Sequence, residues 1–324
     1  MNTGRISYNM TQRSVRKPMK SGSGLLPGFV RYRDCAVVSG KNGDQMVTAV
    51  LTGTIGMAQE VRLLFCRGEN QILCQGGRVQ AISAAIVIPT DWEESRLADV
   101  TAELSGLCRK AGADFAQMHV TAAEQIAVPV LTLSFLGELC KEECLPEPGA
   151  AILAVGHAGM AGVAILAQNG REALKKRYAG AFLEKTDAWW NELSLRQATE
   201  ALDGFSCYRY PVQEGGVLAA LWYLADGLGK GFDISMKQIP IRQQTVEICE
   251  FYRINPYQLA GDGMMLVVTE KAEECAARLQ EKGMEAVLLG FITADKAKIL
   301  RNEEEVRYLD KPARDELETF RQKI

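Results

Sequence analysis

The amino-acid sequence predicts a mixed α/β (α+β) protein of two domains. With 324 residues the chain is long enough for roughly two domains of ordinary size. Apolar runs that are typical of strands alternate with segments of helical periodicity in both halves. Two prolines lie close together in "CLPEPG" (144–149), as they would in a linker. We therefore expect two sheets covered by helices, one on each side of this segment.

The expected boundaries divide the chain into four parts. Residues 1–33 form a basic arm with seven lysines and arginines and no acid. A first domain covers 34–145, a second covers 146–310, and a helical tail covers 311–324. A mobile tail is one interpretation of the arm.

In the first domain, β-branched runs on both sides of Asn42-Gly43-Asp44 predict a hairpin. Residues 69–89 predict a short helix, a break at Gly76-Gly77 and an apolar strand. A helix is expected over 91–113, ended by Gly112, and a strand over 127–139.

The second domain repeats this alternation. The stretch "GAAILAVGHAGMAGVAILA" (149–167) is long enough to span a membrane, but its glycines and its histidine favour a strand, a glycine turn and a helix. Helical periodicity returns in 215–231 and 241–254. The stretch 264–293 then predicts a β-α-β unit, whose helix is capped by Thr269 and ended by Gly283.

Composition excludes several classes of function. The chain is 47% hydrophobic and 24% charged with a net charge of -3, so nucleic acid is not an expected partner. The sequence predicts neither a secretory signal nor a membrane span. Nine scattered cysteines indicate reduced thiols in a cytoplasmic protein, and no zinc-site spacing is present. Cys140 and Cys144 have the spacing of one helical face, either as core residues or as a metal or redox pair.

Residues 216–293 closely resemble a known superfamily. A Gly-Gly-helix, a short strand, "IPIR" (239–242), a helix ending near Asn255-Pro256 and a small loop before a strand follow in order. This series is similar to the C-terminal domain of aminoimidazole ribonucleotide synthetase (PurM), selenophosphate synthetase, thiamine-monophosphate kinase and the hydrogenase expression/formation protein HypE. The resemblance is strongest to HypE and to the archaeal AIR synthase-related proteins. It implies a PurM N-terminal-like domain that forms dimers and a PurM C-terminal-like domain.

The resemblance extends upstream to the glycine loop of residues 156–162. Gly156, Gly159 and Gly162 match the family's loop at the start of the second domain, where a helix N-terminus can point amides at an anion. His157 in this loop could donate to the same anion. The alternative is that the glycines allow tight packing of the strand against the helix.

In the first half, the resemblance implies ATP and Mg²⁺ bound by carboxylates from short motifs. Asp34 in "RDCAVV" keeps one of them and is the candidate metal ligand. The next acidic position carries Thr52 and Gly53, the Asn-Asp pair becomes Asn70-Gln71, and a later segment contains His119. Mg²⁺ requires hard oxygen ligands and usually carboxylates, so a single acid predicts weak Mg-ATP binding.

Two further features differ from the family, and the role of a third residue has two interpretations. The segment "RYPVQEGG" (209–216) keeps the two glycines but not the family's aspartate, and Glu214 is the nearest substitute. The last cysteine of the sequence is Cys275, whereas HypE carries a reactive cysteine at its C-terminus. Asp262, in Gly261-Asp262-Gly263, is either a ligand-contacting acid or only a turn residue.

Two hypotheses follow. The first is a diverged, non-catalytic HypE-like protein with a binding or regulatory role. The second is an ATP-dependent enzyme of the HypE, PurM or ThiL type with relocated ligands, for which Asp34, Asp44, Glu214 and Asp262 are the available acids. By resemblance we also expect a homodimer, a nucleotide or other small ligand, and a hydrogenase-maturation partner. The resemblance also suggests that Lys17, Lys20 and "SGSG" (21–24) fold over nucleotide phosphates.

Overall fold

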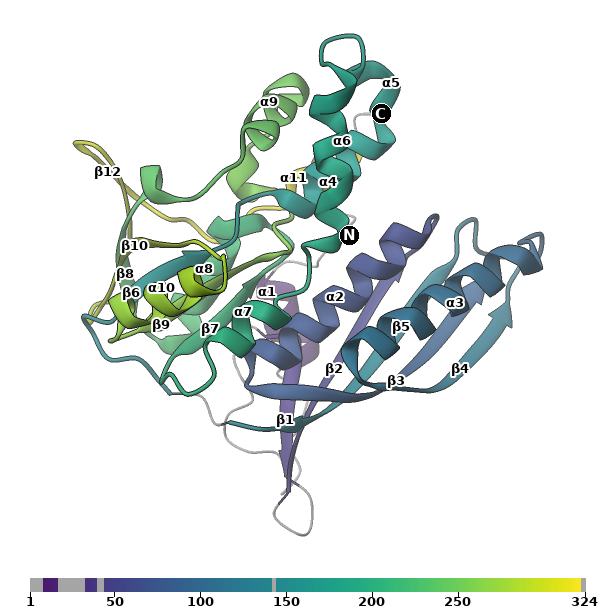
Figure 1. Cartoon of the computed structure of the whole chain (residues 1–324), viewed down its shortest axis with the longest axis horizontal. Coiled ribbons are helices and arrows are strands. Elements are labelled where there is room, and N and C mark those ends of the chain that lie inside the picture. Colours follow the sequence, from purple (N-terminus) through teal and green to yellow (C-terminus); the bar gives the residue numbers. More distant parts are fainter. Residues whose placement is uncertain (1–7, 17–32, 40–43, 142–143, 322–324) are drawn as a thin grey trace. The chain divides into compact units, whose positions relative to one another are not determined.

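A computed structural model describes residues 8–16, 33–39, 44–141 and 144–321 (Figure 1). The chain forms two compact units, one from Gly24–Glu142 and the other from Met1–Ser23 with Glu143–Ile324. Each unit has a hydrophobic core of its own. The fold is therefore the two-domain mixed α/β fold that the sequence predicts.

The unit of residues 24–142 is built on a five-stranded sheet with the strand order β1-β2-β5-β3-β4. Only the β3–β4 pair is parallel; the other pairs are antiparallel. The first two strands form the predicted hairpin, although residues 40–43 of its turn lie outside the described part of the chain. The strands are β1 Cys35–Ser39, β2 Gln45–Thr54, β3 Gly77–Ile88, β4 Asp114–Ala122 and β5 Val130–Leu139.

Two helices, α2 (Ala58–Cys74) and α3 (Glu94–Ala111), cover one face of this sheet (Figure 1). Alternate residues of the strands, such as Leu131, Leu133 and Phe135 of β5, are buried beneath them. The helices are also joined to each other, because Arg62 and Glu103 form an ion pair of 2.8 Å.

Helix α2 is much longer than the short helix expected around residues 69–75. It begins at Ala58, where the carboxylate of Glu60 accepts a hydrogen bond from the amide of Met57 at 3.2 Å and satisfies a donor at the helix start. The first turns carry charged residues between the apolar ones, so the buried face is weakly marked in the sequence. Polar Asn70 and Gln71 are buried in the same helix, which also obscures its pattern.

The prediction that Cys140 and Cys144 share a helical face is wrong. Strand β5 continues to Leu139, and the amide of Cys140 donates to the carbonyl of Gly76 at 3.0 Å. Neither cysteine lies in a helix, and both are exposed. The spacing misleads here because residues four apart lie on one face only when the backbone is helical.

The other unit is built on a seven-stranded sheet with the order β12-β11-β8-β10-β6-β9-β7. All its pairs are antiparallel except β11–β8. The strands are β6 Ala151–Val155, β7 Tyr208–Val212, β8 Gly231–Ser235, β9 Met264–Thr269, β10 Ala286–Thr293, β11 Lys298–Asn302 and β12 Glu305–Tyr308.

Strand β6 lies inside this sheet between β9 and β10, and all five of its residues are buried. Because β9 and β10 are both antiparallel to β6, they run parallel to each other, as the predicted β-α-β unit requires. The connecting helix α10 is Ala272–Glu281. The amide of Lys271 donates to the hydroxyl of Thr269 at 3.1 Å just before this helix.

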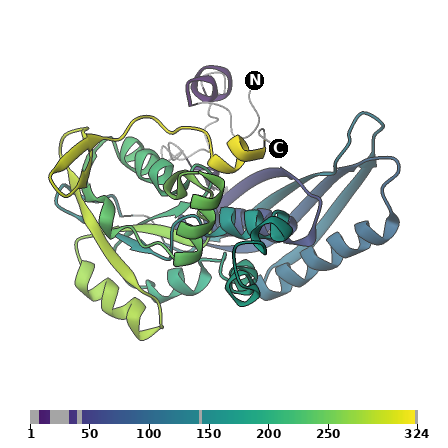
Figure 2. The same cartoon turned by 90° about the horizontal axis from the view of Figure 1, so that it is seen from above.

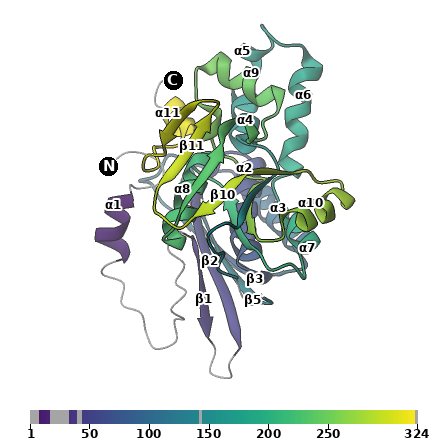
Figure 3. The same ribbon diagram turned by 90° about the vertical axis from the view of Figure 1, so that its left-hand side faces the viewer.

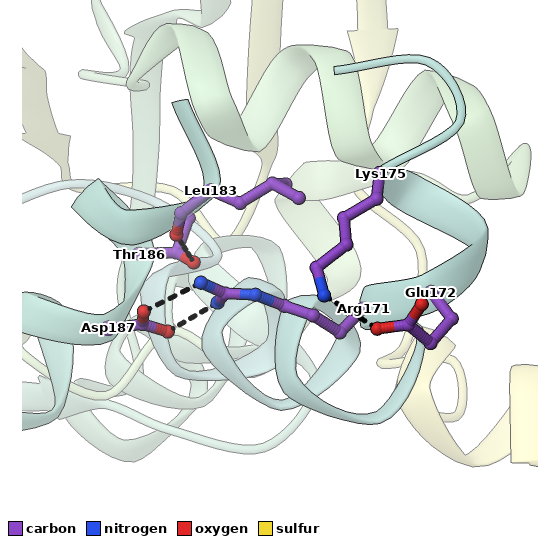
Figure 4. Close-up of polar contacts among 6 residues, drawn as sticks. All are labelled: Arg171, Glu172, Lys175, Leu183, Thr186 and Asp187. Carbon is purple, nitrogen blue, oxygen red and sulfur yellow. Dashed lines mark hydrogen bonds and ion pairs between the residues drawn. The ribbon is translucent and has the colours of Figure 1, made fainter. Parts of the chain in front are cut away.

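The helices α4, α5, α6 and α9 lie beyond one end of the sheet (Figures 1 and 3). Arg171 in α5 makes a bidentate ion pair with Asp187 in α6, with N–O distances of 2.7 and 3.0 Å (Figure 4). The remaining helices include two short ones at the ends of the described chain. Besides α10, the α-helices described in this unit are α1 Tyr8–Met10, α4 Met160–Asn169, α5 Arg171–Leu174, α6 Gly180–Ala188, α7 Arg196–Ala201, α8 Gly216–Leu228, α9 Gln243–Tyr252 and α11 Glu316–Arg321.

Four single turns complete the secondary structure: a π-helical turn over Thr11–Arg16 and 3₁₀ turns over Trp189–Asn191, Met236–Gln238 and Pro256–Gln258. Of the predicted basic arm, residues 8–16 form helical turns, while Lys17, Lys20 and the segment 21–24 lie outside the described residues. No helix in the described part of the chain has the length and apolar character needed to cross a membrane.

Candidate functional site

The candidate residues fall into two groups, one in each unit. Asp34, Asn70, Gln71 and His119 belong to the unit of residues 24–142. Those of the other unit are Gly156, His157, Gly159, Gly162, Glu214 and Asp262. Each group is described within its own unit.

The five-stranded sheet has one face that α2 and α3 do not cover, and His119 lies on it. Its neighbour Met118 points the other way and accepts a contact from the hydroxyl of Thr101 in α3 at 3.5 Å. Successive side chains of a strand alternate between faces, so the exposed imidazole of His119 is on the uncovered face.

Two rows of mainly polar residues run across this uncovered face, and each row consists of paired residues on adjacent strands. In the first row, Thr52, Thr132, Ala85 and His119 are consecutive partners on β2, β5, β3 and β4. The hydroxyl oxygens of Thr52 and Thr132 are 2.9 Å apart. The row is thus hydroxyl-rich, with an imidazole at its end.

The second row has the same character. Val50, Ser134, Ser83 and Gln117 are the consecutive partners, and Val50 is 60% exposed. Sequence reasoning did not identify Thr132, Ser83 and Ser134 as part of this surface. A signal was available in β5, where Thr132 and Ser134 alternate with the buried Leu131, Leu133 and Phe135.

Asn70 and Gln71 do not join this surface. They lie in α2, on the opposite side of the sheet, and are only 1% and 5% exposed. Asp34 precedes the edge strand β1 and is half-buried. Its neighbour Arg33 is buried and donates to the side-chain oxygen of Gln75 at 3.2 Å. The structure therefore does not gather the four candidates of this unit around one point.

The two central rows of the uncovered face do not fit a magnesium ion that bridges nucleotide phosphates. Both central rows carry hydroxyl, amide and imidazole groups and no carboxylate, whereas Mg²⁺ is usually held by one or two carboxylates in addition to phosphate oxygens. Among the residues that the structure describes, there is also no group of three or more His, Cys, Asp or Glu side chains arranged to hold a metal.

In the other unit, the glycine loop between β6 and α4 is packed tightly against residues 256–264. A Cβ on Gly156 would lie 2.4 Å from the carbonyl oxygen of Gly263, and one on Gly162 would lie 2.3 Å from the side chain of Leu259. The amide of Gly162 donates to the carbonyl of Ala260 at 2.9 Å. These contacts account for Gly156 and Gly162 by the close approach of residues 259–263, whereas the alternative stated from sequence was tight packing of the strand against the helix.

Asp262 is fully buried next to this loop. Its exposed fraction is 0%, and Gly263, with φ of 93°, turns the chain directly into β9. The amide of Gly261 donates to the carbonyl of Gln213 at 3.2 Å, which ties the segment to the turn before α8. The carboxylate therefore lies inside the unit and away from solvent.

Glu214 lies in that turn, residues 213–216, and is half-buried. The amide of Gly216 closes the turn by donating to the carbonyl of Gln213 at 3.1 Å. The amide of Gly215 donates to a carboxylate oxygen of Asp315 at 2.7 Å. The acid nearest to this amide is thus Asp315, which sequence reasoning did not select.

His157 belongs to a half-buried charged cluster that the sequence did not reveal. Burial lowers the pKa of its imidazole, and the neighbouring guanidinium of Arg242 lowers that pKa further. Arg242 pairs with Glu192 at 2.6 Å and lies over the ring of Trp189, 5.1 Å from its centroid. An imidazole beside a guanidinium can accept or donate a hydrogen bond to a polar ligand near neutral pH.

Comparison with known proteins defines the relatives of this chain, although no family model matches the sequence. A putative hydrogenase expression/formation protein of Methanocaldococcus jannaschii is 23% identical over 234 residues, which are 70% of this chain and 68% of that protein. The carbamoyl dehydratase HypE of Rhodobacter capsulatus is 25% identical over 246 residues, 73% of this chain and 70% of that protein. These curated relatives are hydrogenase expression/formation proteins, HypE among them.

Solved HypE structures share its fold. HypE in complex with ATP has a TM-score of 0.72 and 16% identity, covering 98% of this chain and 97% of that one. HypE from a HypE–HypF complex gives a TM-score of 0.71 with 19% identity, covering 87% and 94%. A ThiL protein complexed with AMPPCP and TMP gives 0.67 with 14% identity, covering 86% and 92%. The predicted resemblance to the PurM superfamily, and to HypE within it, is confirmed.

Proposed function

We propose that this chain is a diverged HypE-like protein in which Mg-ATP catalysis is weakened or lost and which has a binding or regulatory role. The observation that supports this most directly is the polar but uncharged surface around Thr52, Thr132 and His119. HypE-like architecture is kept around it.

The lack of charge on these rows bears directly on metal binding. A triphosphate carries several negative charges, and Mg²⁺ is held against it when carboxylates on the protein complete an oxygen shell. Hydroxyls and amides can hydrogen-bond to phosphate oxygens, but they supply no negative charge for the metal. We therefore expect any nucleotide to bind weakly and without a strong requirement for Mg²⁺.

A second candidate function, an ATP-dependent enzyme with relocated ligands, is favoured by the structural relatives. The HypE structure that contains ATP aligns over almost the full length of this chain, and the ThiL structure contains the ATP analogue AMPPCP. Asp34 and Asp44 in one unit, and Glu214 and Asp262 in the other, are the acids that this function would use.

Calorimetric titration with ATP, with and without Mg²⁺, separates the two. The first proposal expects a Kd of about 1 mM or weaker and little effect of the metal, whereas micromolar binding that requires Mg²⁺ would contradict it. The Asp34→Asn variant tests whether Asp34, the candidate metal ligand, contributes to metal-dependent binding. Asp91→Asn, in an exposed turn of the same unit, is its control. Loss of metal-dependent binding in the first variant alone would establish the enzyme-like alternative.

We further propose a homodimer formed through the uncovered face of the five-stranded sheet. Val50, in the second row, is 60% exposed there. A Val50→Glu substitution would bring like charges together across such an interface and should convert the dimer to a monomer in light scattering after gel filtration. Val128→Glu, at a 50% exposed loop position, is the control and should stay dimeric. A monomeric native protein would exclude the proposal.

A protein partner and a cellular location complete the proposal. One of the structural relatives was solved in a HypE–HypF complex, so we propose a partner from hydrogenase maturation and a cytoplasmic location. Co-purification of HypF with the tagged chain is the expected result. Failure to bind HypF at micromolar concentrations would exclude this partner and leave the ligand proposal unaffected.

A further inference from the structure

The C-terminal segment 310–321 lies across the unit of residues 143–324 and ends in the short helix α11, as the yellow ribbon of Figure 2 shows. At its start, the amide of Leu309 donates to the carbonyl of Lys298 at 2.8 Å, next to the β11–β12 hairpin. Beyond this point two contacts tie the segment to the unit at separate places, one at the start of α8 and one at the end of α9.

The first contact is made by Asp315, which is only 9% exposed. One carboxylate oxygen accepts a hydrogen bond from the amide of Gly215 at 2.7 Å, immediately before α8. The other accepts from the amide of Leu317 at 2.8 Å, in the first turn of α11. A single buried carboxylate therefore caps α11 and at the same time links it to the start of α8.

The second contact is made by the other end of α11. The ring of Phe320 lies edge-on against Tyr252 of α9, with centroids 4.6 Å apart. Leu317, one turn earlier, is 6% exposed. Burial raises the pKa of the Cys249 thiol in α9 to about 12, and the charge of Glu316 in α11 raises it further.

Helix α11 has six residues, far fewer than the roughly 12–15 that an isolated helix needs in water. Its structure therefore depends on contacts with the rest of the unit, and a segment that moves as one body would lose both of these contacts together. We propose that residues 310–321 form a C-terminal clasp that closes over the turn 213–216 and opens as one unit. The open clasp exposes this turn, which carries Glu214, so the clasp controls access to one candidate residue. This inference holds whether or not the protein catalyses a reaction of Mg-ATP.

Hydrogen exchange of the intact chain tests the clasp. Asp315→Ala should speed exchange at the amides of Gly215 and Leu317 by about tenfold or more, because their common acceptor is lost. Phe320→Ala is the decisive variant. Phe320 contacts Tyr252 rather than the turn, yet it should speed exchange at Gly215 by a similar factor if the segment opens as one unit.

Two controls accompany these variants. Ala313→Ser, at an exposed position in the same segment, should exchange like the native protein. The amides of the buried strand β6 should remain protected, which shows that the unit is still folded. If Phe320→Ala disturbs β6, Phe320→Leu takes its place and is judged in the same way. Native exchange at Gly215 in the folded Phe320 variant, or faster exchange at Gly215 alone in Asp315→Ala, would overturn the clasp.

Discussion

Gly68 lies in helix α2 against the ring of Phe135, which is 2% exposed and also meets Phe65 edge-on with centroids 5.7 Å apart. A Cβ at residue 68 would lie 2.1 Å from a ring carbon of Phe135. Gly68→Ala should therefore lower the free energy of unfolding by about 1–3 kcal/mol, despite the better helix propensity of alanine. Urea denaturation measures this change.

Gly106 in α3 is the matched control, because a Cβ there meets nothing within 4 Å. Gly106→Ala should raise the free energy of unfolding by about 0.5–1 kcal/mol through helix propensity alone. If both variants were more stable than the native protein, the close contact between Phe135 and Gly68 of α2 would be contradicted.

His157 should make the protein less stable in acid. Burial and Arg242 hold its folded-state pKa below the ordinary value of 6.5, so the unfolded chain binds the proton more readily. Above the unfolded pKa the imidazole is neutral in both states and has no effect; as the pH falls below it, protonation favours unfolding. His157→Gln should flatten the dependence of stability on pH below about 6.5. An unchanged slope in denaturation series at pH 7.5 and 5.5 would contradict this assignment.

The cysteines should divide sharply in reactivity. Only Cys140 and Cys144 are exposed, and seven others are buried. Burial raises the pKa of Cys108 to about 11 and that of Cys249 to about 12, so these thiols remain protonated and unreactive near neutral pH. Titration with a thiol reagent should modify two cysteines in the native protein and nine after denaturation. Mass spectrometry that located fast modification at a third residue would reveal local opening.

The helices α5 and α6 are joined by the ion pair of Arg171 and Asp187 shown in Figure 4. Asp187 is 53% exposed, so water screens the pair and Asp187→Asn should cost only about 0.2–1 kcal/mol. Glu172→Gln breaks the pair with Lys175 within a single turn of helix and should cost less, because it joins no separate elements. A double-mutant cycle of Arg171 and Asp187 measures the coupling directly. A value near zero would mean that packing alone holds the two helices.

The long periodic segments were predictable from sequence, and the elements that were not predicted have physical explanations. Helix α3, the strand–loop–helix of residues 151–169 and the β9–α10–β10 unit follow from hydrophobic period and turn residues. The first half of α2 was missed because its charged residues dilute the apolar stripe. Strand β7 was not predicted, and it contains Pro211, which is tolerated there because β7 lies at the edge of its sheet.

The candidate site was less predictable because it depends on faces and registers. The motif comparison could name Asn70 and His119 but could not tell that the sheet separates them. Thr132 and Ser134 become neighbours of Thr52 and Ser83 only through strand pairing, and no local pattern states which strands pair. Asp315 is one hundred residues from the amide that it binds, which no local motif can indicate.

The described residues form two separate hydrophobic cores, and each core should respond to substitutions among its own residues. Leu104 is fully buried in the core of residues 24–142, so Leu104→Ala should destabilise that unit by about 2–5 kcal/mol. Three of the four tryptophans, at 189, 190 and 222, belong to the other unit and report on it by fluorescence.

Hydrogen exchange combined with this fluorescence should therefore show the first unit opening at lower denaturant concentration while the tryptophan transition stays in place. A common shift of both signals would instead mean that the units unfold cooperatively.

Strand β6 has a consequence for the order in which the chain acquires its structure during synthesis. Its two neighbours come from residues 264–269 and 286–293, more than a hundred positions later in the sequence. A ribosome that has just made β6 must add most of the second half before either edge of this wholly apolar strand is covered. The nascent polypeptide thus carries an unprotected aggregation-prone stretch for much of its translation, and we expect it to depend on chaperones until its last strands emerge.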